Sequence, residues 1–340
     1  MSEQHAPDTG SDPVAEIEEA GRTLAEARRQ IAKRIVGQEA VVELALTAIL
    51  SGGHALLVGV PGLAKTRLVE TLGTVLGLDA NRIQFTPDLM PADILGSEVL
   101  EEGQDGARLF KFIEGPIFTQ LLLADEINRA SPRTQSALLQ AMQEKVVTVA
   151  GQTRVLAKPF HVLATQNPIE QEGTYPLPEA QLDRFLLQID MGYPTRDEER
   201  DILLATTGVE DATADRVFDA EGLIKLQRLV RAMPVGETVV EAIIGLVRSA
   251  RPGEPDGASS ATERLAFGPG PRAAQSLMLA VRARALLQGR LAPGIDDVRA
   301  LAAPALTHRM ALTFAARAEG ASLGDVIAGL LDAAALEQAA

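Results

Sequence analysis

The chain has 340 residues, enough for about two domains with a substantial core. Its net charge of -14 argues against a nucleic-acid binder, because phosphate contacts need clustered Lys and Arg. With no Cys, the chain can form no disulfide, no thiolate zinc site and no cysteine nucleophile. No apolar run approaches the ~18 residues that span a bilayer, and residues 1–13 lack the layout of a signal peptide, so we expect a cytoplasmic protein without a membrane span.

The polar N-terminus is followed by two helical patterns and a short strand. We expect residues 1–13 to be disordered, because they contain little that could be buried. Apolar residues recur at near-heptad spacing over residues 14–34 and form one face over residues 38–51, which predicts two helices. Residues 54–58 are a short apolar strand that leads directly into a glycine-rich turn.

The glycine-rich turn reads Gly-Val-Pro-Gly-Leu-Ala-Lys-Thr at residues 59–66. This is the P-loop pattern, except that Ala64 stands where the pattern has its second Gly and takes a positive φ less easily. In such a turn, backbone N–H groups surround phosphate oxygens at a helix N-terminus, Lys65 reaches the β- and γ-phosphates, and Thr66 binds Mg²⁺. The alternative is a glycine-rich turn that precedes a lysine by chance, but such a turn would not be expected to lie between a strand and a helix. We therefore predict ATP binding by Gly59, Val60, Pro61, Gly62, Leu63, Ala64, Lys65, Thr66 and Arg67.

Four further strands are expected downstream of the turn, separated by helical stretches. Several of these strands are continuous apolar runs, which are typical of strands buried on both faces of a parallel sheet. The alternation of strands and helices predicts a doubly wound α/β domain. The expected strands are residues 82–85, 121–125, 160–165 and 185–189, and the clearest helix is 132–144.

Two insertions interrupt this alternation, and the strand signals end near residue 193. Residues 89–118 are Gly-interrupted with a small hairpin expected at 109–113, and residues 145–156 read as a hairpin. Residues 195–340 are rich in Ala and Leu and predict helices, with a Pro-, Gly- and Ser-rich loop at 253–270. We therefore expect an α/β domain at 14–193 and an all-helical domain at 194–340.

Three polar residues follow the ends of two expected strands. Because ligands lie at the carboxyl ends of parallel strands, Asp125 is expected to face Mg²⁺ and Glu126 to polarise the attacking water as a general base. The alternative, a pair of solvated acids that cap the next helix, is weakened by the upstream P-loop. Asn167 could orient the same water, which is compatible with the turn that Asn167 and Pro168 also form.

Four segments together resemble the MoxR family of AAA+ ATPases. The resemblance covers about residue 31 to the C-terminus, and Ala64 is the form that this family usually carries. It implies a sheet order of 5-1-4-3-2, a helix-2 insert at 89–118, a hairpin before the sensor strand at 145–156, and a helical lid. The segments are Gly-x-Pro-Gly-x-Ala-Lys-Thr at 59–66, Ala-Asp-Glu-Ile-Asn-Arg-Ala at 124–130, Ala-Thr-Gln-Asn-Pro at 164–168 and Glu-Ala-Gln-Leu-Asp-Arg-Phe at 179–185.

The resemblance also assigns roles to residues outside the P-loop. Gly37 and Gln38 correspond to the adenine-side segment. Arg184 corresponds to the arginine finger supplied to a neighbouring subunit, although without the family it would read as a helix-end cation paired with Asp183. Arg272 corresponds to the sensor-2 arginine of the lid, and a cation in the first turn of a helix is favourable only if an anion compensates the helix dipole.

Four other arginines and one histidine carry further expectations. Arg129 is a further interface candidate. His308 and Arg309 are expected to be a structural pair in a helix, since no spaced second His accompanies them to form a metal site. Arg282 and Arg284 are expected to be solvated or interfacial.

The sequence and the resemblance together predict a Mg²⁺-dependent ATPase in a hexameric ring. We expect it to act as a chaperone that remodels partner proteins or inserts metals or cofactors into them, together with a von Willebrand factor A domain protein. The alternatives are a magnesium-chelatase-like subunit, a DNA-remodelling motor and a non-hydrolysing scaffold. The expected catalytic residues are Lys65, Glu126, Asn167, Arg184 and Arg272, and the expected metal ligands are Thr66 and Asp125.

Overall fold

The computed structural model describes residues 13–102, 108–170, 173–208, 212–254, 257 and 262–337. Of residues 1–13, which were expected to be disordered, 1–12 lie outside the described residues, and Pro13 instead begins the first helix. A five-stranded parallel sheet has the order β2-β5-β8-β1-β9, which is the predicted order 5-1-4-3-2 read from the β9 edge. The predicted strands are confirmed to within two residues at their ends. The sheet consists of β1 (Ala55–Gly59), β2 (Ala80–Gln84), β5 (Leu121–Asp125), β8 (His161–Gln166) and β9 (Leu187–Met191).

The two faces of this sheet are buried in two separate hydrophobic cores. Successive side chains of a strand point to opposite faces, so Leu57 and Leu123 enter one core while Leu56 and Leu122 enter the other. The first face is covered by α1 (Pro13–Ala32), α2 (Glu39–Leu50) and α3 (Lys65–Leu76), and the second by α4 (Pro91–Leu95) and α5 (Pro132–Glu144). This burial on both faces explains the apolar runs of the sequence.

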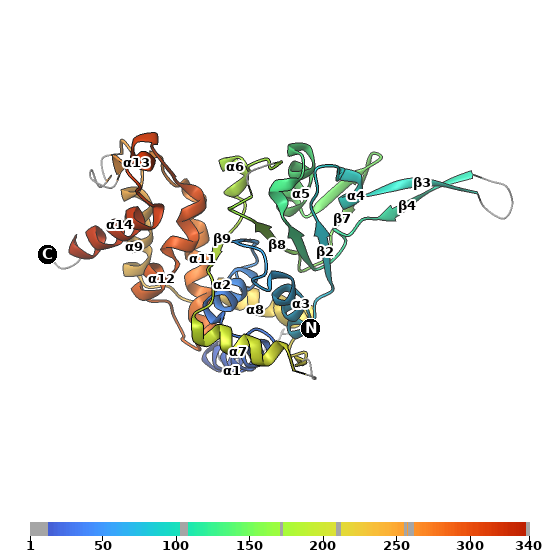
Figure 1. The fold of residues 1–340 in the computed structure, drawn as a ribbon. Helices are drawn as coiled ribbons and strands as arrows, with labels where there is room; N and C mark the ends of the chain where they lie inside the picture. Colours follow the sequence, from blue (N-terminus) through green and yellow to red (C-terminus); the bar gives the residue numbers. More distant parts are fainter. Residues whose placement is uncertain are drawn as a thin grey trace, which may run out of the picture.

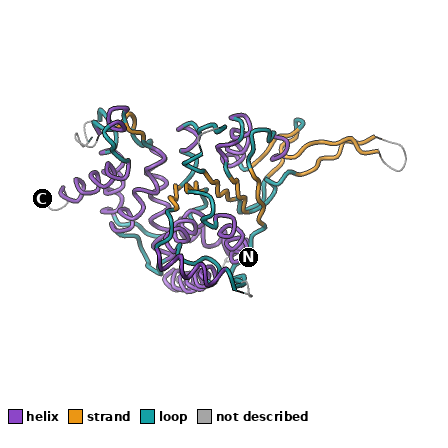
Figure 2. The backbone as a smooth tube through the Cα atoms, in the orientation of Figure 1, coloured by secondary structure: helices purple, strands orange, loops and turns teal. Residues whose placement is uncertain are grey.

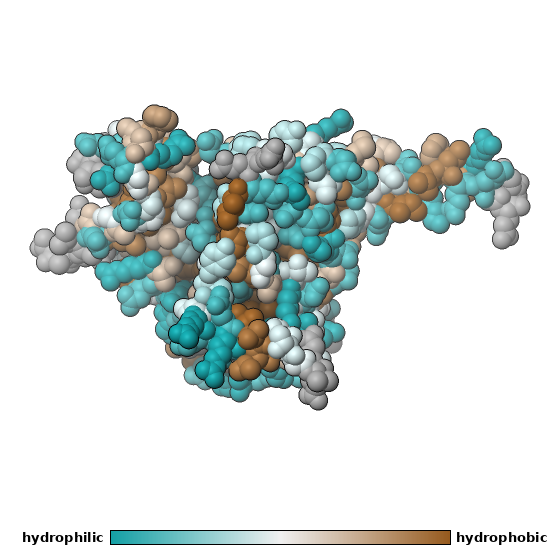
Figure 3. Space-filling view, in the orientation of Figure 1, coloured by the Kyte–Doolittle hydropathy of each residue, from teal (hydrophilic) through white to brown (hydrophobic). Residues whose placement is uncertain are grey.

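The insert between β2 and β5 forms a long antiparallel ribbon, which we call the arm. It pairs β3 (Gly96–Glu102) with β4 (Arg108–Glu114) and points away from the body of the molecule (Figures 1 and 2). The hairpin predicted at 109–113 is therefore too short. Most side chains of β3 are exposed, so its sequence lacks the apolar alternation from which a strand is predicted. Leu109 and Phe110 are 66% and 73% exposed, and the arm carries hydrophobic surface in Figure 3.

The second predicted hairpin is confirmed. It consists of β6 (Val146–Val149) and β7 (Gln152–Val155), which follow α5 and precede the strand β8. Arg154 places its guanidinium over the ring of Phe112, with 3.8 Å between them, so the hairpin contacts the base of the arm.

The C-terminal part forms the predicted lid, which is helical apart from one short ribbon. Residues 265–267 of the expected loop 253–270 instead form a strand, β10 (Leu265–Phe267), that pairs with β11 (Ala311–Leu312). In the part of the chain that the structure describes, no helix is both long and apolar enough to cross a membrane. The remaining elements are η1 (Ile127–Arg129), α6 (Glu179–Leu182), α7 (Arg196–Thr206), α8 (Ala220–Ala232), α9 (Glu237–Ser249), α11 (Pro271–Leu287), α12 (Ile295–Leu306), η2 (Thr307–Arg309), α13 (Phe314–Ala318) and α14 (Leu323–Glu337).

The lid and the sheet domain share one continuous core. Residues from α8, α9, α11, α12 and α14 belong to the same hydrophobic cluster as the first face of the sheet. The predicted domain boundary at residues 193/194 falls between β9 and α7. Because the core is continuous across this point, the boundary between two domains stays a prediction.

Arg284 was expected to be solvated or interfacial, and its side chain is not solvated, because it is only 20% exposed and paired within the chain. Arg284 donates to Glu43 of α2 (2.9 Å) and to Asp297 of α12 (2.6 Å). The Asp297 side chain is fully buried and also binds Arg290 at 2.5 Å. Burial alone would raise the pKa of Asp297, but hydrogen bonds from Arg290, the Gly294 amide and Arg284 hold that pKa below its usual value. This ion-pair network joins the lid to the sheet domain.

Candidate ATP site

The P-loop connects the carboxyl end of β1 to the first turn of α3. Gly62 and Ala64 both have positive φ, at 87° and 55°. An L-residue in this left-handed region costs about 1–2 kcal/mol, so the structure shows why the pattern has Gly at position 64. The ammonium of Lys65 donates to the Gly59 carbonyl. Burial lowers the pKa of Lys65, while the charges of Asp125 and Glu126 act in the opposite direction.

One cavity collects the predicted phosphate-side residues. It is lined by residues 61–67 of the P-loop and by Asp125, Glu126, Thr165 and Asn167 from the ends of β5 and β8. Thr66 and Asp125 thus offer a hydroxyl and a carboxylate oxygen to the same space, which is the oxygen donor chemistry that Mg²⁺ prefers. These residues fit a nucleotide phosphate with its cation.

Thr165 holds the two acidic residues in a fixed relation, and sequence reasoning missed it. Its hydroxyl donates to Asp125 Oδ1 (2.7 Å) and accepts from the backbone N–H of Glu126 (2.8 Å). The available signal was a hydroxyl residue directly after the apolar run Val-Leu-Ala at residues 162–164 of this buried strand. Asn167 lies just beyond, where its side chain accepts from the Ile169 N–H (3.2 Å) in the expected turn.

Glu126 has an unusual backbone and a tightly held side chain. Its φ of 58° lies in the left-handed region, a strained conformation that residues at functional sites often adopt. Oε2 of Glu126 accepts from Gln84 (2.7 Å) and from Arg129 (2.9 Å). Arg129 also donates to Glu170 at 2.7 Å. Arg129, which was an interface candidate, thus contacts Glu126 and Glu170 within its own chain.

A second cavity continues from the P-loop toward α7, next to the segment that was expected to lie on the adenine side. Gln38 lines it and donates to the Leu63 carbonyl (3.1 Å). Gly37 has a φ of 71°, and a Cβ there would meet the side chain of Glu198, so glycine permits α7 to approach. Of the predicted nucleotide-binding residues, Gly37, Gly59 and Val60 line neither cavity, and Val60 packs against the core. Sequence reasoning missed the apolar lining by Tyr193, Ile202 and Leu203.

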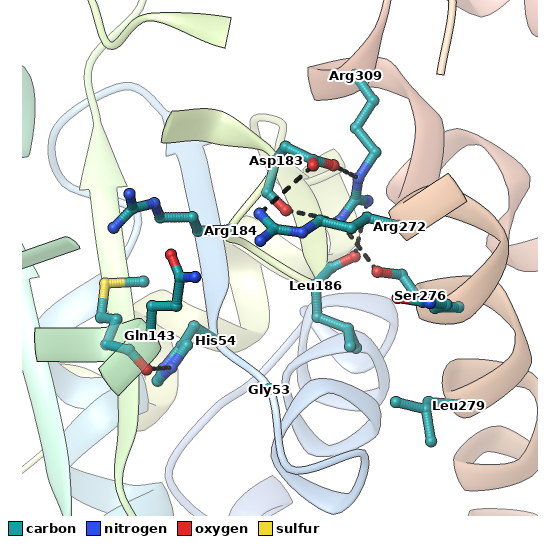
Figure 4. Close-up of a pocket in the computed structure, with 12 residues that line it drawn as sticks. Gly53, His54, Gln143, Asp183, Arg184, Leu186, Arg272, Ser276, Leu279 and Arg309 are labelled. Atoms are coloured by element: carbon teal, nitrogen blue, oxygen red, sulfur yellow. Dashed lines mark hydrogen bonds and ion pairs between the residues drawn. The ribbon is translucent and has the colours of Figure 1, made fainter. Parts of the chain in front are cut away.

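Arg184 and Arg272 lie together near the amino ends of the strands, on the opposite side of the sheet from the P-loop (Figure 4). We call this region the arginine edge. Arg184 precedes β9, whose residue Leu187 is in register with Ala55 at the start of β1, whereas the P-loop follows the end of β1. Five residues of strand span about 16 Å, so the structure does not bring either arginine to the P-loop of its own chain.

Asp183 organises this arginine edge. It binds Arg309 (2.7 Å) and Arg272 (3.7 Å), whereas Arg184 donates to the Leu139 carbonyl (2.6 Å). The alternative pairing of Arg184 with Asp183 is therefore not formed. His308 binds the Phe185 carbonyl at 3.0 Å, so the structural roles predicted for His308 and Arg309 are confirmed.

The strand–turn–helix at the P-loop, the sheet order and the carboxylates at the neighbouring strand ends define a P-loop ATPase of the AAA+ class. Residues 54–187 match the family described as "ATPase family associated with various cellular activities (AAA)", and residues 257–329 match the AAA lid domain.

Comparison with known proteins then gives the family. The chain is 42% identical to the chaperone MoxR1 of Mycobacterium tuberculosis, over 98% of this chain and 86% of the relative. It is 33% identical to the protein MoxR of Methylorubrum extorquens, over 84% and 86%. A crystal structure from Cytophaga hutchinsonii, described as that of a candidate ATPase, superposes with a TM-score of 0.85 at 36% identity, covering 94% of this chain and 96% of the other. The chain belongs to the MoxR family of AAA+ ATPases.

Proposed function

We propose that this chain is a Mg²⁺-dependent ATPase that hydrolyses ATP in a hexameric ring and thereby remodels partner proteins. The observation that carries this proposal is the separation of the site into two halves. Lys65, Thr66, Asp125 and Glu126 lie at the carboxyl edge of the sheet, and Arg184 lies with Arg272 at the amino edge. A neighbouring copy that places its amino edge against the P-loop would complete the site.

Each residue then has a distinct task. Lys65 would bind the β- and γ-phosphates, and Thr66 and Asp125 would hold Mg²⁺, which supplies positive charge beside the phosphates when bound. The Glu126 carboxylate would polarise the attacking water while Asn167 orients it. Arg184 and Arg272 of the neighbouring copy would neutralise charge on the γ-phosphate, an effect worth about 10³–10⁵ in rate for an arginine finger.

Remodelling of a partner is supported by one relative and one structural feature. The Mycobacterium tuberculosis relative is named a chaperone, and the arm exposes apolar side chains far from the core. The proposal includes a cytoplasmic location, a von Willebrand factor A domain partner and metal or cofactor insertion as the form of remodelling, which rest on the family resemblance.

The general base is tested by Glu126→Gln. Steady-state phosphate release should fall by about 10²–10⁴, while nucleotide affinity stays within a few-fold, because the amide cannot accept the proton. The exposed Glu221 of α8 gives a matched control, Glu221→Gln, which should leave turnover unchanged. Unchanged turnover in Glu126→Gln would exclude Glu126 as the base.

The shared site is tested by mixing two inactive variants. Lys65→Ala removes the phosphate ligand but keeps the finger, and Arg184→Ala does the reverse. Mixed rings should regain part of the wild-type rate, because an Arg184→Ala copy can receive the finger of a Lys65→Ala neighbour. A mixture no faster than either variant alone would contradict hydrolysis between copies.

A further inference from the structure

A groove of about 550 Å³ lies between α1 and α8, at the end of the molecule opposite α6 and α13 (Figure 1). Its volume falls within the range of about 300–1,000 Å³ that is usual for binding sites. It shares no lining residue with the two cavities of the ATP site or with the arginine edge. None of the residues that line it has a role in the function proposed above.

The floor of this groove is apolar and belongs to the main core. Ala20 of α1 and Leu226 of α8 are each 7% exposed. Phe218, just before α8, and Leu229 are partly buried and pack against the same core. Because the core holds these side chains in place, the groove keeps its shape without an occupant.

The two walls of the groove carry opposite charges. Glu16 and Glu19 line it from α1, and Lys225 and Arg228 line it from α8. Each pair is three residues apart, so its two side chains lie on the same side of their helix. All four residues are exposed. The groove is therefore an apolar strip with an acidic row along one side and a basic row along the other.

Neither wall belongs to the parts of the chain that define the ATPase and its lid. Those parts are the matched segments 54–187 and 257–329. The groove is lined by residues from 16–23, before the first segment, and from 218–232, between the two. The surface that these residues form is therefore available for a task other than hydrolysis.

We propose that this groove is the docking site for a helix of a partner protein, whose apolar stripe has basic residues on one flank and acidic residues on the other. The basic flank would face Glu16 and Glu19, and the acidic flank would face Lys225 and Arg228. This inference goes beyond the proposed hydrolysis of ATP and does not depend on it.

The length of the groove fits two turns of an α-helix. The α1 wall runs from Glu16 to Thr23, a distance of about 10 Å along the helix axis. Over that distance a helix presents apolar side chains at positions i, i+3 or i+4, and i+7, which is the usual pattern for a helix bound in a groove.

The charges of the walls decide both the class and the direction of the occupant. A nucleic acid or an anionic membrane would meet the acidic row and be repelled by it. A helix that is turned end for end exchanges its two flanks, so only one direction places each flank against a row of opposite charge. Opposite charges across an interface thus fix how the partner is oriented.

The test uses three designed fluorescent peptides of about 18 residues, or five helical turns. All three have the same leucine stripe, and their flanks are Lys and Glu, Lys and Lys, or Glu and Glu. Binding to the full chain without nucleotide is measured by anisotropy at about 0.15 M salt, which screens charges more than about 8 Å away. The Lys and Glu peptide should bind at least about tenfold more tightly than the other two, because each of those places one flank against a like charge.

Variants of the basic wall should change the order of the three affinities. Lys225→Glu combined with Arg228→Glu makes both walls acidic, so the Lys and Lys peptide should become the tightest ligand by about tenfold. Arg22→Glu combined with Arg29→Glu is the matched control, because it changes the net charge equally at exposed positions of α1 outside the groove and should leave the order unchanged. Leu229→Lys should weaken all three peptides, and the charge test stands even if this variant fails to fold.

The outcomes are distinct from those that test hydrolysis. A Lys and Glu peptide that binds no better than the others, or an order that stays the same in the Lys225→Glu, Arg228→Glu variant, would overturn the inference. A change of oligomeric state in that variant, measured by sedimentation velocity, would also overturn it, because the groove would then be covered by a second copy of the chain. Since binding is measured without nucleotide, a failure of the proposed ATPase function would leave these results unaffected.

Discussion

Three buried histidines at the arginine edge should make the free energy of unfolding strongly dependent on pH. Burial, then the charges of His161 and Lys145, lower the pKa of His54 to about 3. Burial lowers the pKa of His161 to about 4, and burial with the charge of Arg309 lowers that of His308 to about 3.

The hydrogen bonds of His54 show why the folded protein excludes the charged form. Its Nε2 lies 3.2 Å from the Met142 carbonyl and must donate, while its Nδ1 accepts from the Val162 N–H at 2.9 Å. A proton on Nδ1 would point at another N–H group. The imidazole is thus held neutral, in one tautomer.

The size of the effect follows from the difference between the folded and unfolded pKa values. An unfolded His titrates at about 6.5, so at pH 5.5 each unfolded His binds a proton that its folded counterpart does not. Stability therefore falls as pH falls below 6.5, by about 1.4 kcal/mol for each His at pH 5.5. The three together give about 4 kcal/mol, a large part of a typical total of about 5–15 kcal/mol.

Urea unfolding of the nucleotide-free chain at pH 7.5 and pH 5.5 measures this difference. With a urea m value on the order of 4 kcal/mol per M for a chain of this size, the midpoint should move by about 1 M. His161→Gln should reduce the pH-dependent part by about one third, whatever its effect at pH 7.5. A loss below about 1.5 kcal/mol, or a loss unchanged in His161→Gln, would refute the reasoning.

The remaining predictions concern the P-loop, the acidic pair and the lid network. Ala64→Gly should raise the unfolding free energy by about 1 kcal/mol, measured by urea midpoint, because Gly tolerates the left-handed φ. Thr165→Val should lower single-turnover hydrolysis by about 10–100-fold and leave nucleotide affinity within a few-fold, because the acidic pair loses two hydrogen bonds. Asp297→Asn should lower the unfolding free energy by about 2–4 kcal/mol at pH 7.5, and this loss should shrink as pH falls below the ordinary pKa of an aspartate, because the stability that the lowered pKa of Asp297 contributes is lost as pH falls through that pKa.

The sequence predicted those parts of the fold that rest on local patterns. The strand β5 and the helix α5 have the predicted bounds. The strand is an apolar run that ends in an acidic residue, and the helix begins with a Ser N-cap followed by Pro. The arm was predicted too short, since β3 buries almost nothing and apolar periodicity is the signal for a strand.

The sequence also predicted the residues of the phosphate cavity apart from Thr165, but not the contacts among them. Asp125 and Glu126 stood out as two adjacent acids after an apolar strand. Arg82 and Gln84 did not, because their partners lie on another strand more than forty residues away, and a single sequence carries no signal of register. Contacts between distant segments are therefore where the structure adds most.

Arg309 makes the arginine edge and the lid one mechanical unit. Its side chain is almost fully buried and donates to Asp183 and to the Phe185 and Leu186 carbonyls, in the turn that carries Arg184. It also donates to Ser276 of α11, the helix whose first turn carries Arg272. If α11 moved relative to the turn that carries Arg184, the Arg309 guanidinium would lose buried hydrogen bonds to one of the two segments. A rotation of the lid would therefore either break these hydrogen bonds or displace Arg184 and Arg272 together, and the proposed site shared with a neighbouring copy needs the second outcome.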